Sequence, residues 1–164
     1  MPRCRMFLLV LICTVAFAGI AGAKSPAGSD AWDALVDEFI DQAMFALNPS
    51  AATAAGVHTY DSQLEDRSRA GVEKQITVLK KFEARTEAVD PAGLSPLETA
   101  DRETLLNSIR GSLLSLEAIR SWEKDPDGYS SGAANSIYVI MSRRFAPPDE
   151  RLRSVVAREE QFPQ

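Results

Sequence analysis

Residues 95–122 read SPLETADRETLLNSIRGSLLSLEAIRSW, and this stretch predicts the longest helix of the chain. Ser95 is a typical N-cap, Pro96 suits the first helical position, and Glu98 stands three residues after the cap. Beyond this start, apolar residues recur at helical spacing: Leu105, Leu106, Ile109, Leu113, Leu114, Leu116 and Ile119. Because the apolar stripe is wide, we expect a central helix with neighbours on two sides.

Gly111 lies in the interior of this predicted helix. A glycine there costs about 1 kcal/mol relative to alanine. We interpret Gly111 as a point where a neighbouring helix packs closely.

Two helices and a short break are predicted on the N-terminal side. The first helix begins at Ser29 or Asp30 and ends near Leu47, and the second runs from about residue 69 to 88. Between them, residues 49–56 form a short helix or turn that closes at Gly56. Asp33, Asp37 and Asp41 are spaced four apart on the polar side of the first helix, which is typical of a solvated acidic face.

Two more helices are predicted on the C-terminal side, after a turn at residues 125–128. The fourth helix spans about residues 133–144, and its expected buried residues are Ile137, Tyr138, Ile140 and Met141. The fifth begins at Pro147-Pro148, and its apolar face begins with Leu152, Val155 and Val156. No alternating strand pattern is long enough to predict a sheet. The fold class is therefore all-α, with antiparallel helices in a bundle.

The first 23 residues have the pattern of a secretory signal peptide. Arg3 and Arg5 precede 18 uncharged residues, and Ala21-Gly22-Ala23 fits an A-x-A cleavage site. An uncleaved anchor is the alternative, but 18 apolar residues are at the short limit for spanning a bilayer. We expect an exported chain, periplasmic or extracellular, whose residues 24–164 keep no stable membrane anchor.

Composition narrows the classes of function. Both cysteines, Cys4 and Cys13, lie in the signal segment, so residues 24–164 have no disulfide and no thiolate ligand. The net charge is −5 for the whole chain, and loss of Arg3 and Arg5 leaves 16 basic against 23 acidic residues, or −7. A nucleic-acid partner is not expected, because neutralising phosphates needs a basic surface.

The chain has a single histidine, His58. A catalytic zinc site usually takes three protein ligands, mostly histidines, so neither a metal site nor a catalytic residue is predicted in this chain. His58 stands close to Tyr60 and Asp61. A His–Asp pair can act as a proton relay or as one corner of a metal site, whereas the simpler interpretation is a loop whose polar side chains position the helices.

The C-terminal stretch is basic, while the first helix is acidic. The basic residues are Arg143, Arg144, Arg151, Arg153 and Arg158. Such asymmetry indicates either a site for an anionic ligand or ion pairs with the acidic helices.

Several short motifs follow one another along the chain. The first are Leu47-Asn48-Pro49, Ala52-Thr53, Gly56, His58, Tyr60-Asp61 and residues 64–68. Those that follow are Leu94-Ser95, Asp101, Leu105, Leu116-Glu117, Trp122, Asp125-Pro126, Tyr129, residues 144–147, Arg151, Arg158 and Pro163. Each motif is modest, but their order and spacing make the set fairly specific, and the set resembles the bacterial domain-of-unknown-function family DUF885.

The resemblance implies a function and a larger fold, which the residues alone do not indicate. Members of that family are longer, many are secreted, and they are similar to gluzincin metallopeptidases. They are mostly helical, with H-E-x-x-H and a downstream glutamate binding zinc in the C-terminal half. Residues 24–164 would then be the truncated N-terminal helical region of a larger fold, helping to wall a cleft for a peptide substrate. Zinc is expected only in the missing C-terminal part, and His58, Tyr60 and Asp61 become candidates for the cleft wall.

Two other functions stay open. The chain can instead be a complete small helical module that binds a periplasmic partner. An intrinsic hydrolase is the third possibility, although no H-E-x-x-H, G-x-S-x-G or glycine-rich phosphate loop is present. The sequence does not indicate an oligomeric state.

Overall fold

The computed structural model describes residues 27–162, so the predicted signal segment lies outside the described residues. Residues 27–162 are largely helical and contain no β-strand, which confirms the all-α class. In that range, no helix has both the length and the hydropathy needed to cross a bilayer.

The helices follow one another with short connections. Two of the long helices end in π-helical segments, in which the backbone hydrogen bonds span one residue more than in an α-helix. The elements are α1 (Ala27–Phe39), η1 (Ile40–Phe45), α2 (Pro49–Ala55), η2 (His58–Tyr60), α3 (Arg69–Glu87), η3 (Pro91–Gly93), α4 (Pro96–Leu113), η4 (Leu114–Ile119), η5 (Ser121–Glu123), α5 (Asp127–Met141) and α6 (Pro148–Glu159). The π-helical segments are η1 and η4.

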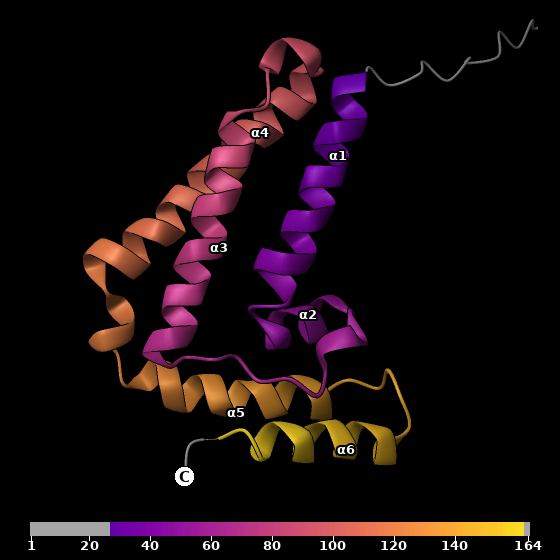
Figure 1. Cartoon of the computed structure of the whole chain (residues 1–164). Helices are drawn as coiled ribbons and strands as arrows, with labels where there is room; N and C mark the ends of the chain where they lie inside the picture. Colours follow the sequence, from indigo (N-terminus) through magenta and orange to yellow (C-terminus); the bar gives the residue numbers. More distant parts are fainter. Residues whose placement is uncertain (1–26, 163–164) are drawn as a thin grey trace, which may run out of the picture.

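The helices form an upright group and a crossing pair. In Figure 1, α1, α3 and α4 stand side by side with alternating direction, while α5 and α6 lie antiparallel across their lower end. The short helix α2 sits at the junction and contacts both η1 and α5. The helices within each group are antiparallel, as predicted. The sequence does not predict that the second group crosses the end of the first.

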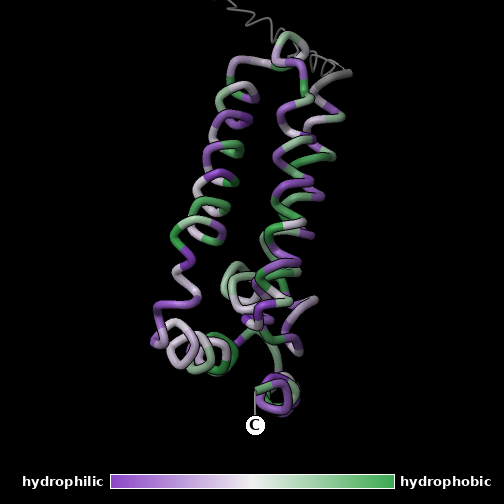
Figure 2. The backbone as a smooth tube through the Cα atoms, turned by 60° about the vertical axis from the view of Figure 1, so that its left-hand side comes forward, coloured by the Kyte–Doolittle hydropathy of each residue, from purple (hydrophilic) through white to green (hydrophobic). Residues whose placement is uncertain are grey.

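Each group has its own apolar cluster. The upright helices enclose Phe39, Ala43, Leu79, Phe82, Ile109 and Leu113. The crossing pair encloses Val139, Ile140 and Val155, with Ala54 of α2 packed against them. Figure 2 shows hydrophobic and hydrophilic residues alternating around each turn of the long helices, as expected for helices with one buried face.

Most predicted boundaries are confirmed, with two exceptions. The helix expected to reach Trp122 ends with η4 at Ile119, because Arg120 has a left-handed φ of 54°. The larger departure is α5. Its expected start was near residue 133, whereas the helix begins at Asp127 and ends at Met141 rather than near residue 144. Asp127 accepts hydrogen bonds from the hydroxyls of Ser130 and Ser131, which supports the additional turn. Proline is also compatible with a helix start, so Pro126 does not separate the turn from the helix.

The predicted buried faces of α5 and α6 are partly wrong. Tyr138 is 67% exposed and Met141 is 51% exposed, whereas Ser136 and Ile140 are fully buried. On α6, Leu152 and Val156 are also exposed. The buried face of α6 instead carries Val155 together with an arginine, which the apolar pattern does not reveal.

The interpretation of Gly111 as a close-packing point is wrong. A Cβ atom built on Gly111 would have no heavy atom within 4 Å, and the residue is exposed.

Gly111→Ala is therefore expected to stabilise the protein by about 0.5–1 kcal/mol, because alanine lowers the backbone entropy lost on folding and meets no neighbour. Thermal or urea unfolding of the purified protein measures this change. An unchanged or lowered midpoint contradicts it.

The start of α4 is the capping box that the sequence predicts. The Ser95 hydroxyl accepts the Glu98 N–H at 3.3 Å, and the Glu98 carboxylate accepts the Ser95 N–H at 2.7 Å. The Ser29 hydroxyl of α1 also donates to Glu98. Hydrogen bonds from Ser29 and Ser95 hold the pKa of Glu98 below its ordinary value.

Ser95→Ala is expected to lower the free energy of unfolding by about 1 kcal/mol at neutral pH, since the variant loses the N-cap acceptor. A carboxyl whose folded pKa is lowered stabilises the fold above its ordinary pKa and loses that effect as pH falls through the lowered value. The difference between wild type and variant should therefore shrink in acid. Urea unfolding at several pH values tests this, with Ser112→Ala as control, because the half-buried Ser112 of the same helix bonds only the preceding turn.

Candidate functional site

The loop between α2 and α3 brings together two of the three candidate residues. Gly56 ends α2 with φ of 87°, a conformation that favours glycine, and η2 follows. His58 Nδ1 lies 2.9 Å from the Asp61 carboxylate, and the imidazole stacks on Phe145 with ring centroids 3.8 Å apart. The Asp61 residue is only 7% exposed, while His58 keeps about a third of its side chain in solvent.

Tyr60, the third candidate, is not part of this pair. Its hydroxyl donates to the Asp41 carboxylate of η1 at 2.5 Å. That hydrogen bond to a carboxylate raises the pKa of Tyr60. Tyr60 therefore ties the loop to the end of the first helix, and Asp41 is bonded rather than simply solvated as the sequence predicts.

Beneath the loop lies a buried polar network centred on Arg158 of α6. The Arg158 side chain is fully buried and donates from Nε to the Asp61 backbone oxygen at 2.8 Å. Nη1 donates to the Ser136 backbone oxygen at 2.6 Å and to the Ser50 hydroxyl at 3.2 Å. Nη2 donates to the Thr53 hydroxyl at 2.9 Å. We call these five residues the Arg158 network.

The network joins four segments through neutral acceptors. Ser50 and Thr53 belong to α2, Ser136 to α5, and Asp61 to the loop. The Thr53 hydroxyl donates in turn to the Asp61 carboxylate at 2.6 Å, so the same carboxylate is held from below by Thr53 and from above by His58. The loop conformation is therefore set by contacts that also hold α2 against α5 and α6.

Two nearby carboxylates compensate the buried charge. Burial lowers the pKa of Arg158, and the charges of Glu65 and Asp61 oppose that shift. The Glu65 carboxylate also accepts the Ser50 N–H at 2.8 Å, at the start of α2. An arginine stays protonated in proteins, so α6 places a permanent positive charge inside the fold.

Gln161 extends the same attachment along the loop. Its side-chain amide donates to the Ser62 backbone oxygen at 2.8 Å, and its side-chain oxygen accepts the Leu64 N–H at 3.1 Å. Arg158 and Gln161 are three residues apart, so they lie on one side of the C-terminal helix end. Together they fix residues 61–64 to that end.

The candidate pair lines a small pocket. The hollow has a volume of about 230 Å³, and its wall includes His58, Asp61, Phe145 and Glu150. Within residues 27–162, no group of three or more His, Cys, Asp or Glu residues is arranged to hold a metal ion. Such a donor set does not fit a zinc site, which normally takes three protein ligands. The pair offers hydrogen-bonding and proton-accepting groups to a small molecule or a peptide.

The basic C-terminal stretch predicts either an anionic-ligand site or ion pairs with the acidic helices. For Arg158 both predictions are wrong, because its side chain is fully buried and donates to neutral acceptors. Arg143 and Arg151 donate mainly to backbone oxygens of α2, α5 and the following loop. The acidic residue Glu38 of α1 pairs with Lys81 and Arg85 of α3 instead. One feature of the sequence indicates that Arg158 is buried: it stands three residues after Val155, on the same side of the helix.

The fold and this loop define an all-α protein whose helices are joined by a buried arginine. The model of a family described as bacterial protein of unknown function (DUF885) matches residues 49–164. The chain belongs to that family. No curated protein and no solved structure matches the chain significantly.

Proposed function

We propose that the chain is the non-catalytic N-terminal helical portion of a secreted or periplasmic zinc-metallopeptidase-like protein, where it forms part of the wall of a peptide cleft. The observation that carries this proposal is the attachment of the His58–Asp61 loop to the fully buried Arg158. A loop held by three other segments is suited to presenting a fixed surface to a substrate. The resemblance of the family to gluzincin metallopeptidases supports the assignment to a secreted zinc-metallopeptidase-like protein.

The chemistry of the loop favours a positioning role over a catalytic one. The Asp61 carboxylate accepts one hydrogen bond from the Thr53 hydroxyl and interacts with His58, and the Asp61 backbone oxygen accepts from Arg158. A nucleophile or general base needs a group that is free to approach the reacting atom. In this role, any zinc would be held by residues beyond this chain, and the exposed edge of His58 and the pocket beside it would contact the peptide.

Two observations on the native gene test this proposal. Sequencing past codon 164 should show a continuing reading frame that encodes H-E-x-x-H and a later glutamate. An antibody raised against residues 24–164 should detect, in the periplasmic fraction or the medium, a protein much larger than the 17.9 kDa of the 164 residues. A natural stop codon without that motif, or a cytoplasmic product, contradicts the proposal.

The complete helical binding module is the second candidate, and the two apolar clusters favour it. Both clusters are assembled within residues 27–162. If the purified chain is monomeric and unfolds in one cooperative transition, it has a self-sufficient core and the module is supported. Aggregation, or a molten state with exposed apolar surface, supports the portion of a larger protein. Peptidase activity of the purified chain that a chelator abolishes would contradict both.

A further inference from the structure

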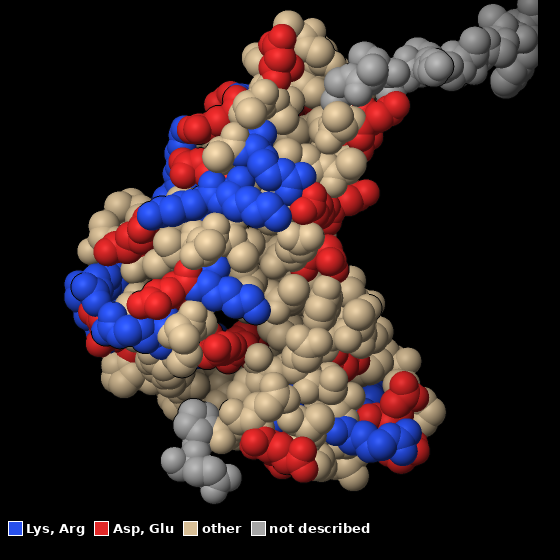
Figure 3. Space-filling view, in the orientation of Figure 1, with Lys and Arg blue, Asp and Glu red and all other residues tan. Residues whose placement is uncertain are grey.

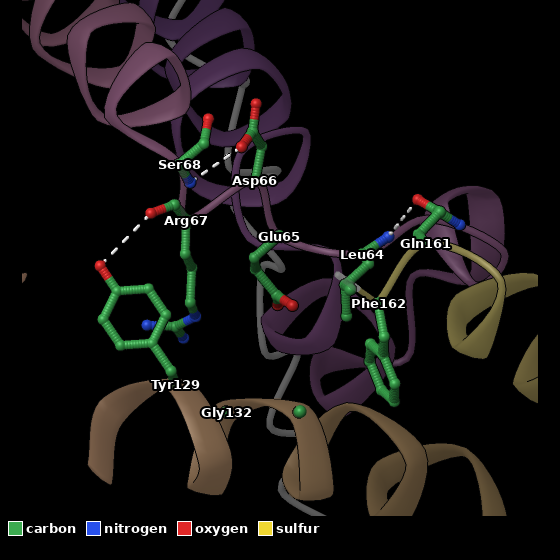
Figure 4. Close-up of a pocket in the computed structure, with 10 residues that line it drawn as sticks. Leu64, Glu65, Asp66, Arg67, Ser68, Tyr129, Gly132, Gln161 and Phe162 are labelled. Carbon is green, nitrogen blue, oxygen red and sulfur yellow. Dashed lines mark hydrogen bonds between the residues drawn. The ribbon is translucent and has the colours of Figure 1, made fainter. Parts of the chain in front are cut away.

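A second and larger hollow lies between the segment 64–68, α5 and the residues that follow α6. It has a volume of about 470 Å³, within the range of small-molecule sites. Leu64 and Phe162 form an apolar wall, and Tyr129 and Gly132 of α5 form the floor (Figure 4). Figure 3 shows the surface hollowed between the upright helices and α5. The hollow is therefore suited to hold an apolar group.

Hydrogen bonds hold the wall in place without a ligand. The side-chain oxygen of Gln161 accepts the Leu64 N–H at 3.1 Å. On the floor, the Tyr129 hydroxyl donates to the Trp122 backbone oxygen at 2.8 Å and lies 3.5 Å from the Arg67 backbone oxygen. Because both ends of the wall are fixed, a ligand would meet a preformed site and would spend little free energy on ordering it.

Arg67 brings a positive charge with unused donors to this hollow. Among residues 27–162, no ion pair within 4 Å and no hydrogen bond involves its guanidinium. A Cβ atom built on Gly132 would lie 3.0 Å from both Nε and Nη2 of Arg67, so the guanidinium lies directly against the floor. A guanidinium can bind a carboxylate through two parallel hydrogen bonds. An anionic group therefore fits beside Gly132.

The two carboxylates of the same segment are engaged elsewhere. Glu65 accepts the Ser50 N–H at 2.8 Å, and its charge compensates the buried Arg158. Asp66 accepts the Ser68 N–H at 3.0 Å, and in Figure 4 it points to the opposite side of the segment from Arg67. Their negative charges still disfavour a ligand with several negative charges, since like charges repel. A ligand with one carboxylate fits better than a phosphate or a dicarboxylate.

We propose that this hollow binds an amphipathic monocarboxylate, a small molecule with one carboxylate and an apolar body. The carboxylate binds the Arg67 guanidinium, and the apolar body packs against Leu64 and Phe162. The site requires no group from Glu65. It goes beyond the wall role proposed above and does not depend on it, because neither His58 nor Asp61 lines this hollow.

Calorimetric titration of the purified chain with octanoate tests the site. We expect saturable binding with one site per chain. Octanol, which keeps the apolar body but has no charge, should bind about tenfold more weakly, and octylammonium should bind more weakly still. Added salt should weaken the binding of octanoate and leave that of octanol unchanged, because the Arg67 side chain is exposed. Absence of saturable octanoate binding, or binding of octanol or octylammonium as tight as that of octanoate, overturns the proposal.

Two variants separate the charged contact from the apolar one. Arg67→Gln should weaken octanoate binding about tenfold and leave octanol binding unchanged, because octanol has no carboxylate to lose its partner. Phe162→Ala should weaken the binding of both compounds by a similar factor, since it removes part of the apolar wall. Arg153→Gln removes another exposed arginine, on α6 and outside the hollow, and is the matched control for Arg67→Gln.

Circular dichroism reports whether each variant keeps its helices. If Phe162→Ala fails to fold, the comparison of Arg67→Gln with Arg153→Gln decides by itself. Equal losses of octanoate and octanol binding in Arg67→Gln, or an equal loss of octanoate binding in Arg153→Gln, overturn the assignment of the carboxylate to Arg67.

Discussion

Replacement of Arg158 by methionine is expected to lower the free energy of unfolding by about 3–5 kcal/mol. Methionine fills a similar volume but donates no hydrogen bond. The backbone oxygens of Asp61 and Ser136 and the hydroxyls of Ser50 and Thr53 would lose their donor. A buried acceptor without a partner costs about 1–3 kcal/mol.

Loss of the positive charge of Arg158 is also expected to lower the free energy of unfolding. Asp61 is nearly buried and its carboxylate stands close to the guanidinium, so removal of Arg158 leaves a negative charge without compensation. Arg158→Lys keeps the charge and should recover part of the loss. It cannot recover all of it, because an ammonium group on a flexible stem does not reproduce the planar arrangement of donors.

Urea unfolding of the purified chain measures the effect, with Arg153→Met as the matched control. Arg153 is on the same helix, its side chain is 72% exposed, and its ion-pair partner among residues 27–162 is Asp149. Its replacement should change stability by less than about 0.5 kcal/mol. Equal small effects at both positions would show that the Arg158 network does not hold α2, α5 and α6 together.

The helices that the sequence predicts well are those with strong local signals. The start of α4 is confirmed because the capping box of Ser95 and Glu98 is made within four residues of the chain. The starts of α3 and α6 are confirmed for similar reasons: Ser68 accepts the Gly71 N–H, and Pro148 suits the first turn. Local hydrogen bonds and the backbone restriction at proline depend only on residues close together in the chain. They can therefore be predicted from the sequence alone.

Which face of a helix is buried depends on distant residues. On α5, the apolar residues Tyr138 and Met141 predict one face, whereas the small Ser136 marks the face that the structure buries. The Ser136 backbone oxygen accepts a hydrogen bond from Arg158, 22 residues later in the chain, so this face of α5 lies against α6. An apolar pattern cannot reveal a polar group that is buried for the sake of a hydrogen bond.

The candidate site was predictable only in part for the same reason. The spacing of His58 and Asp61 indicates a local pair, and the structure brings them to 2.9 Å. The alternative that their loop positions helices was also available from the sequence. The Arg158 network that holds the loop joins residues up to 108 positions apart, between Ser50 and Arg158. No local pattern carries that information.

Phe82→Ala is expected to lower the free energy of unfolding by about 3–5 kcal/mol through a cavity in the upright helices. Phe82 is fully buried, and its ring meets that of Phe39 edge to face, with centroids 5.3 Å apart and planes at 85°. Such a pair adds about 0.5–1.5 kcal/mol beyond the apolar area that it buries. The cost therefore includes both the lost transfer free energy and the lost contact with α1.

The position of Phe82 makes this substitution a test of how the two groups of helices are coupled. Phe82 lies in the upright cluster, whereas Arg158 belongs to α6 of the crossing pair. If the chain folds as one cooperative unit, the losses from Phe82→Ala and Arg158→Met should each appear in a single transition and should add within about 0.5 kcal/mol, because the sites share no partner. The exposed Leu97→Ala, at 71% exposure, is the control for Phe82 and should be nearly neutral. Two separated transitions in the Phe82 variant would instead mean that α5 and α6 unfold independently of the upright helices.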